Sequence, residues 1–146
     1  METKFNFNSQ VCTSHPQSKR LLTLGLKKET ADMFIWIDNR ASEARNTSYI
    51  PKDYFLEYYR EYLIRDGSVF IPAWSLHRLI CMIPEEIVTD GYSYNLCIDN
   101  DSICHFEYSA CTYDHFIRCE NLYDAIVGYI EWLIKKGYFN KKYLNS

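Results

Sequence analysis

The chain has 146 residues, of which 47% are hydrophobic and 24% are charged. This balance indicates one globular domain, 1–146, with enough apolar surface for a single core, and it excludes a disordered or low-complexity protein. Sixteen basic and nineteen acidic residues give a net charge of -3. No overall positive field is therefore present to attract phosphates, and nucleic acid is disfavoured as a partner.

The N-terminal stretch METKFNFNSQ lacks the basic start, the apolar run and the small-residue cleavage site of a signal peptide. No apolar stretch reaches the roughly 18 residues that a membrane-spanning helix needs. These features predict a cytoplasmic protein without membrane contact. In the reducing cytosol the six cysteines are expected to stay as thiols, so their even number does not indicate disulfides.

A helix with marked ends and a buried strand are predicted near the N-terminus. In SHPQSKRLLTLG, Ser14 and Gln17 can form a capping box, and Gly25 fits the left-handed position that often follows a helix. The apolar run MFIWI, Met33–Ile37, is bounded by polar residues, which is typical of a buried strand. The polar stretch DNRASEARNTS that follows is predicted as a loop.

The middle of the chain has the pattern of two further helices. PKDYFLEYYREYLIRDG, residues 51–67, places aromatic and apolar residues on one helical face, although its acidic residues repel one another at a spacing of four. The pattern leaves open whether this Tyr-rich segment is helical. The other helix is short, because Ser75 can cap it and Pro84 ends it.

From residue 92 the apolar pattern takes a period of two, which predicts three antiparallel strands in a meander. The strands cover Tyr92–Ile98, Cys104–Tyr108 and Tyr113–Cys119. A last helix over NLYDAIVGYIEWLIKKG has Asn121 as its cap and Gly137 as its stop. The predicted fold class is α+β, an antiparallel meander sheet of three or more strands with helices packed mainly on one face.

The register of the meander depends on the length of its first turn. A three-residue turn, 99–101, places Leu96 opposite Cys104, so that the apolar side chains share one face. A two-residue turn would place Cys97 opposite Cys104 and mix apolar with polar groups. Because a buried face specifies register, we expect the first arrangement, in which His105 points to the other side.

The stretch SICHFEYSACTYDHFIRC, residues 102–119, concentrates three cysteines and two histidines. Structural zinc sites use closely spaced CxxC pairs, and this stretch has none. We therefore expect no metal site. Cys104 and Cys119 are predicted to fill the interior as small hydrophobic groups, and His115 to be a hydrogen-bonded core histidine.

The sequence contains no P-loop, dinucleotide-binding, zincin, nucleophile-elbow or EF-hand pattern, which disfavours enzymes of those classes. The carboxylates Glu85, Glu86, Asp99 and Asp101 lie beside a proline or in a turn, where they are expected to be solvated rather than catalytic. His77 is expected on the exposed side of its short helix. We therefore predict a non-enzymatic protein with no catalytic residues and no cofactor.

Apolar residues occupy nearly the whole circumference of the last predicted helix, so more than one of its sides has to be covered. The rest of the chain can supply that cover, which makes it a core helix. Alternatively, the helix and the Tyr-rich segment 49–62 form an interface with a second copy of the chain, as a homodimer, or with a host or phage protein. The residues predicted for such a surface are Tyr54, Tyr58, Tyr59, Tyr62, Tyr123, Ile130 and Ile134.

Three stretches, CTSHPQSKRLLTLGLKKETADM, IPAWSL and ENLYDAIVGYIEWLIKKG, together resemble a family of small uncharacterised proteins encoded by Bacteroides-group gut bacteria, their phages and mobile elements. The resemblance covers both ends and the middle of the chain, and it implies no activity, cofactor or catalytic residue. It favours an accessory protein of a phage or mobile element that acts by protein–protein contact. The alternative is a Cys/His metal-binding or nucleic-acid-associated small domain.

Overall fold

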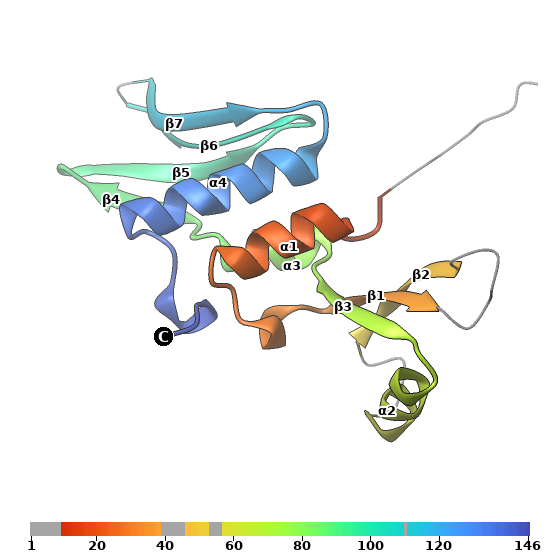
Figure 1. Ribbon diagram of the computed structural model, residues 1–146. Helices are drawn as coiled ribbons and strands as arrows, with labels where there is room; N and C mark the ends of the chain where they lie inside the picture. The colour runs from red at the N-terminus through yellow and green to blue at the C-terminus, as the bar shows by residue number, and fades with distance from the viewer. Residues whose placement is uncertain (1–9, 39–45, 53–56, 110) are drawn as a thin grey trace, which may run out of the picture.

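The computed structural model describes residues 10–38, 46–52, 57–109 and 111–146, which form two antiparallel sheets with helices between them (Figure 1). A three-stranded sheet has the order β2-β1-β3 and a four-stranded sheet the order β4-β5-β6-β7. The strands are β1 (Met33–Asp38), β2 (Asn46–Pro51), β3 (Val69–Ala73), β4 (Glu86–Thr89), β5 (Tyr92–Ile98), β6 (Ser102–Glu107) and β7 (Thr112–Arg118). The helices are α1 (His15–Thr23), α2 (Glu57–Arg65), α3 (Leu76–Met82) and α4 (Leu122–Lys136), with 3-10 turns η1 (Lys28–Thr30) and η3 (Lys141–Tyr143). This architecture confirms the predicted α+β class and its meander.

The helix ends lie where the sequence signals place them. At α1 the Ser14 side chain accepts a hydrogen bond from the backbone of Gln17, and the Gln17 side chain accepts one from the backbone of Ser14, at 3.3 and 2.9 Å. The Ser75 side chain caps α3 by accepting from the backbone N–H of Arg78, and the Asn121 side chain caps α4 by accepting from those of Tyr123 and Asp124. Gly137 ends α4 at a φ of 77°, a left-handed conformation that costs glycine little. These capping predictions are confirmed.

Two segments differ from the sequence-based expectation, and one open question is answered. The stretch predicted as a loop contains strand β2 from residue 46, which pairs with β1, while residues 39–45 lie outside the described residues. Residues 86–89 form β4, a strand that was not predicted. The Tyr-rich segment is helical over Glu57–Arg65, and residues 53–56 are outside the described part of the chain.

The predicted register of the meander is wrong by one residue. The backbone N–H of Asp99 donates to the carbonyl of Ser102, which closes a two-residue turn and places Cys97 opposite Cys104. Leu96 is therefore opposite His105. Because neighbouring side chains on a strand point to opposite faces, this shift turns His105 inward and Cys104 outward. The prediction failed because β6 carries apolar groups on both faces, so the alternation alone does not select one.

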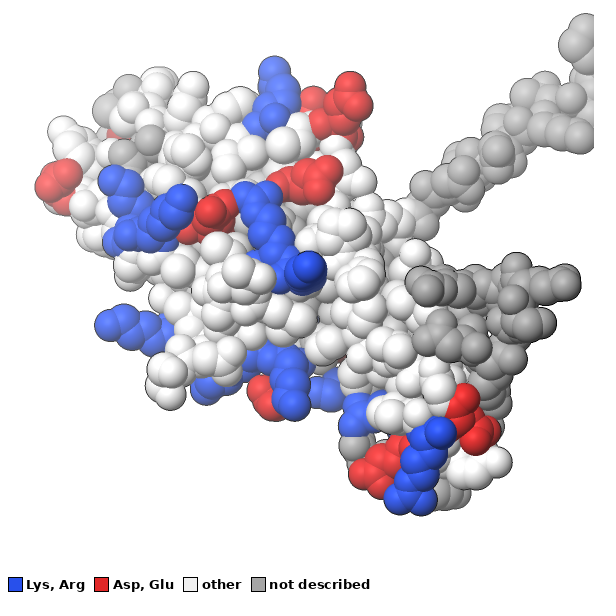
Figure 2. Space-filling model, in the orientation of Figure 1, with Lys and Arg blue, Asp and Glu red and all other residues white. Residues whose placement is uncertain are grey.

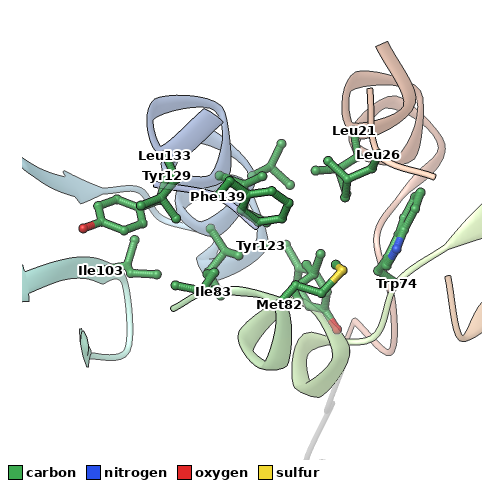
Figure 3. Close-up of a cluster of buried hydrophobic side chains, with 14 of the residues drawn as sticks. Leu21, Leu26, Trp74, Met82, Ile83, Ile103, Tyr123, Tyr129, Leu133 and Phe139 are labelled. Atoms are coloured by element: carbon green, nitrogen blue, oxygen red, sulfur yellow. The ribbon is translucent and has the colours of Figure 1, made fainter. Parts of the chain in front are cut away.

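The core lies between the four-stranded sheet and the layer of α1 and α3, with α4 at its centre (Figure 1, Figure 3). In Figure 3 side chains of α4, β6, α3 and the segment around α1 converge on one cluster. Its fully buried members include Leu21, Trp74, Ile103, Tyr129 and Leu133. A smaller cluster of Cys12, Ile35 and Ala73 joins the N-terminal segment to the three-stranded sheet. Neither α4 nor any other described helix combines the length and apolar composition needed to cross a membrane.

Candidate functional site

The face of the four-stranded sheet that packs against α4, called the inner face, contains a buried histidine. His105 is 1% exposed, and its Nε2 lies 2.6 Å from the carbonyl oxygen of Pro84 while its Nδ1 lies 2.6 Å from the hydroxyl of Tyr129. Because a carbonyl oxygen only accepts, Nε2 carries the proton and Nδ1 of the neutral ring accepts from Tyr129. Burial lowers the pKa of His105 below its ordinary 6.5, although the bond to Pro84 acts in the opposite direction.

His115 also lies on the inner face, as predicted, but toward its margin. Its ring is stacked on Trp132 at a centroid distance of 4.7 Å and near Tyr129 at 6.0 Å. It is half-buried, whereas His105, which was predicted to point away, is the fully buried histidine. The two imidazoles are thus parts of an aromatic cluster under α4.

The cysteines are separated by this arrangement. Cys104 is 7% exposed but lies on the opposite face of the sheet from α4, beside the exposed Cys97, so it is buried without belonging to the main core. Cys119 is half-buried against that core. Burial, followed by the neighbouring thiol, raises the pKa of Cys104. Cys12, buried with Asp32 nearby, has a pKa raised to about 11. Such thiols stay protonated at neutral pH and are poor nucleophiles.

No three side chains of the Cys, His, Asp and Glu types come together to hold a metal ion among the residues described. The carboxylates considered in the sequence are spread out: Glu85 and Glu86 are exposed beside β4, and Asp101 lies 3.5 Å from Arg118. His77 is exposed, as predicted, with its Nε2 3.5 Å from the sulfur of Cys81. Glu85, Glu86 and His77 are thus surface residues.

The opposite face of the same sheet, called the outer face, is aromatic and open. Directly opposed pairs place Phe106 beside Tyr113, and Cys104 beside Phe116. The rings of Phe106 and Tyr108 are 4.9 Å apart, and those of Tyr113 and Phe116 are 5.4 Å apart. Tyr108 is 65% exposed, Tyr113 52% and Phe116 37%. No described helix lies on this face, and α4 packs against the inner one (Figure 1).

One charged pair lies at the end of the outer face. The Arg118 guanidinium is 5.4 Å from the ring centroid of Phe116 and its Nε is 3.5 Å from the Asp101 carboxylate. A row of large rings at fixed spacing, ended by a cation that is already balanced by an anion, suits contact with another apolar surface.

The residues predicted from sequence for an interaction surface do not form one surface. Tyr123 is 7% exposed and Ile130 fully buried, so both belong to the chain's own core, and that part of the prediction is corrected. Ile134 is partly buried against the same core. Tyr62 is 56% exposed on α2, away from the four-stranded sheet (Figure 1). Tyr54 lies outside the described residues, as do the side chains of Tyr58 and Tyr59.

Sequence reasoning missed the outer face, because the expected register assigned Phe106, Tyr108 and Tyr113 to the interior. A signal was present in Asp90-Gly91, a pair typical of two-residue hairpins, which the structure holds at φ values of 52° and 79°. Reading that turn would have added β4 to the predicted sheet. No protein family, no curated protein and no solved structure matches this chain in the three comparisons made.

Proposed function

We propose that this protein is a non-enzymatic interaction module that docks a second copy of itself through the outer face of its four-stranded sheet. The observation that carries the proposal is the exposed row of Tyr108, Tyr113 and Phe116 on that face. Exposed aromatic rings are enriched at protein interfaces, since each buries a large area at a small cost in side-chain entropy. Two such faces packed together would form a sandwich of sheets about 10 Å apart.

Charge favours a second copy as the occupant. At one end of the face Arg118 and Asp101 present one positive and one negative group, 3.5 Å apart. In a two-fold symmetric contact the same surface patch of both copies meets. Arg118 of one copy can then face Asp101 of the other, without net repulsion. A strongly acidic or basic partner would leave one member of the pair without compensation.

The setting we propose is the cytoplasm of a Bacteroides-group bacterium, where the protein would serve as an accessory protein of a phage or mobile element. This part rests on the three stretches that resemble such proteins. The test below also distinguishes three other ligands from a second copy. They are a host or phage protein, a metal ion bound by the Cys97 and Cys104 thiols, and single-stranded nucleic acid stacked on the rings.

The test is the mass of the purified protein by sedimentation equilibrium at several concentrations. We expect a reversible dimer of twice 17.4 kDa, and a monomer for Phe116→Glu, because a buried carboxylate without a partner would oppose association. Tyr62→Glu is the matched control. It places the same charge at an exposed aromatic residue on α2 and should leave the dimer intact.

The result that overturns the proposal is a monomer at all concentrations, or a dimer that Tyr62→Glu disrupts and Phe116→Glu does not. Two further measurements on the same samples identify the alternatives. Near-stoichiometric zinc in protein purified without chelator would indicate a metal site. Retention of a single-stranded oligonucleotide that weakens steeply with salt would indicate a nucleic-acid module.

A further inference from the structure

Two cysteines face each other on the outer face of the four-stranded sheet. Cys97 of β5 is directly opposite Cys104 of β6, and no other two cysteines are opposed in the strand pairs that the structure describes. Their neighbours Leu96 and Ile103 pack in the main core, so the alternation along each strand turns both thiols to the other side of the sheet. The side chains of Cys97 and Cys104 are hydrogen-bonded to each other.

The hairpin turn sets the distance between the two backbones at this pair. The backbone N–H of Asp99 donates to the carbonyl of Ser102 at 2.9 Å, and hydrogen-bonded positions of an antiparallel pair recur at every second residue. Cys97 and Cys104 are therefore a hydrogen-bonded pair, whose Cα atoms lie about 5.5 Å apart. A disulfide spans Cα separations of roughly 4.4–6.8 Å. The two thiols can therefore be joined without a change of register.

Contacts at this end of the sheet keep the register in place. The backbone N–H of Cys119 donates to the carbonyl of Asp101 at 2.8 Å, and the Asp101 carboxylate lies 3.5 Å from Nε of Arg118. Both contacts tie the turn between β5 and β6 to the end of β7. In Figure 2 red and blue atoms stand near one another at the upper edge of the molecule, where β7 leads into α4. The two cysteines thus lie next to an anchored turn rather than a free hairpin end.

From this geometry we infer that Cys97 and Cys104 are a reversible modification site, at which a small disulfide oxidant such as glutathione disulfide closes a cross-strand disulfide. Cys97 is exposed and reacts first: its thiolate attacks one sulfur of the oxidant, forms a mixed disulfide and releases one glutathione thiolate. The Cys104 thiol then loses its proton to solvent, and its sulfur attacks that of Cys97 and expels the second glutathione. The two cysteines lose two electrons and two protons, and glutathione disulfide becomes two thiols. Because burial raises the pKa of Cys104, the second step should be the slower one.

The bond should be easy to reduce again. Opposed side chains in a sheet have Cβ atoms about 4.5–5.5 Å apart, whereas a disulfide prefers roughly 3.5–4.5 Å. Closing the bond therefore strains the hairpin, and strained or exposed disulfides are the ones that thiols reduce readily. The site suits a redox response rather than a permanent crosslink. It lies within one chain and does not depend on the docking function proposed above.

The experiment equilibrates the protein with mixtures of reduced and oxidised glutathione, at the lowest concentration of the sedimentation series. Free thiols are then blocked with an alkylating reagent, and the intact mass shows whether a disulfide lies within one chain. Cleavage after Asp and Glu gives the peptides 91–99, 102–107 and 108–114, which contain Cys97, Cys104 and Cys111 respectively. Mass spectrometry of the linked peptides identifies the cysteines that are joined.

The sequence supplies a matched control within the same chain. Cys104 is seven residues after Cys97 and seven residues before Cys111. In protein unfolded by urea, loop closure alone should therefore give the two pairings within about twofold of each other. In the folded protein Cys111 lies beyond the far end of β6, so the Cys97–Cys104 link should exceed the Cys104–Cys111 link by about tenfold or more. The Cys97–Cys104 link should disappear as the proportion of reduced glutathione rises.

Two variants complete the test. Cys111→Ser should form the Cys97–Cys104 link at the same glutathione ratio as the unmodified protein, whereas Cys97→Ser should leave Cys104 without a protein partner. The inference is overturned if the folded protein shows both pairings equally, if the Cys97–Cys104 link forms at no glutathione ratio, or if it joins two chains. A monomeric mass in sedimentation would remove the docking proposal and leave this one standing. Circular dichroism of each variant verifies that the fold is retained.

Discussion

Single polar residues in the interior of this protein join elements that are distant in sequence. Trp74 Nε1 donates to Thr30 Oγ1 at 2.9 Å, which ties the start of α3 to η1. The backbone N–H of Trp74 donates to Thr13 Oγ1 at 3.0 Å, which ties the same point to the segment before α1. His105 bonds Pro84 and Tyr129 and so joins β6, the end of α3 and α4. Each of these groups is buried, and a buried polar group without its partner costs about 1–3 kcal/mol.

His105 makes the stability of the protein dependent on pH. Its pKa in the folded state is below the ordinary 6.5, so the unfolded chain binds the proton more tightly. The free energy of unfolding should therefore be highest above pH 6.5 and fall as the pH decreases toward the folded pKa. The slope is at most about 1.4 kcal/mol per pH unit for one proton. Urea denaturation at pH 7.5, 6.5, 5.5 and 5.0 measures it.

The comparison for this prediction is His105→Phe, which removes the titrating group. It should lower the free energy of unfolding at pH 7.5 by about 1–3 kcal/mol for each partner left unsatisfied, and it should flatten the dependence between pH 7.5 and 5.5. His77→Gln alters an exposed histidine and should leave that dependence as it is. An unchanged slope in His105→Phe would mean that another group titrates.

At the scale of elements, the ends of helices were predictable from sequence while the faces of strands were not. Ser14, Ser75 and Asn121 act on backbone groups within three residues of themselves, so a local pattern contains the whole interaction. Strand β6 differs, because both of its faces carry apolar groups. Its inner face is fixed by Pro84 and Tyr129, 21 and 24 residues from His105, which no local pattern represents.

The candidate interaction surface also depends on a strand face rather than on a local pattern. The rings of the outer face are visible in the sequence, but only the register shows which of them share a face. The expected register therefore placed Phe106, Tyr108 and Tyr113 in the interior. Residues that meet only through tertiary structure carry no periodic signal.

Gly128 determines how closely α4 approaches β7. A Cβ at this position would lie 3.3 Å from Cδ1 of Ile117, a tight contact with the end of a flexible side chain. Gly128→Ala gains about 1 kcal/mol in helix propensity and loses about the same in displacing that methyl group. The free energy of unfolding of this variant should therefore stay within about 1 kcal/mol of that of the unmodified protein. Gly128→Leu has no such room and should lose about 1–3 kcal/mol. Urea denaturation at pH 7.5 measures both.

A double-mutant cycle separates the two opposing effects. Ile117→Val removes Cδ1, the atom that the new Cβ would meet. In that background Gly128→Ala should be clearly stabilising, because the gain in propensity remains and the clash does not. An equal effect of Gly128→Ala in both backgrounds would show that the contact with Ile117 does not limit the approach of the helix.

For the whole molecule, the question is whether the two sheets form one cooperative unit. The path between them is continuous: β6 and β7 pack on α4, α4 packs on α1 and α3, and α1 packs on β3. Trp74 lies at the junction of β3 and α3. Its side chain is fully buried and belongs to the main core. Arg20 of α1 and Glu131 of α4 also form an ion pair across the helix layer, which lowers the pKa of Glu131. Because the described residues of the three-stranded sheet form only a small cluster of their own, the sheet should depend on this path for its stability.

The three tryptophans allow that dependence to be measured in one protein without substitutions. Trp36 reports on the three-stranded sheet, Trp132 on α4 and the four-stranded sheet, and Trp74 on the junction. Incorporation of 5-fluorotryptophan gives each of them a separate fluorine resonance, assigned by single Trp→Phe variants. In a urea titration the three folded-state signals should disappear with the same midpoint, as a two-state transition requires. Loss of the Trp36 signal at lower urea than the Trp132 signal would instead show that β1, β2 and β3 unfold as a separate unit, and that the contacts of Trp74 are too weak to couple the two sheets.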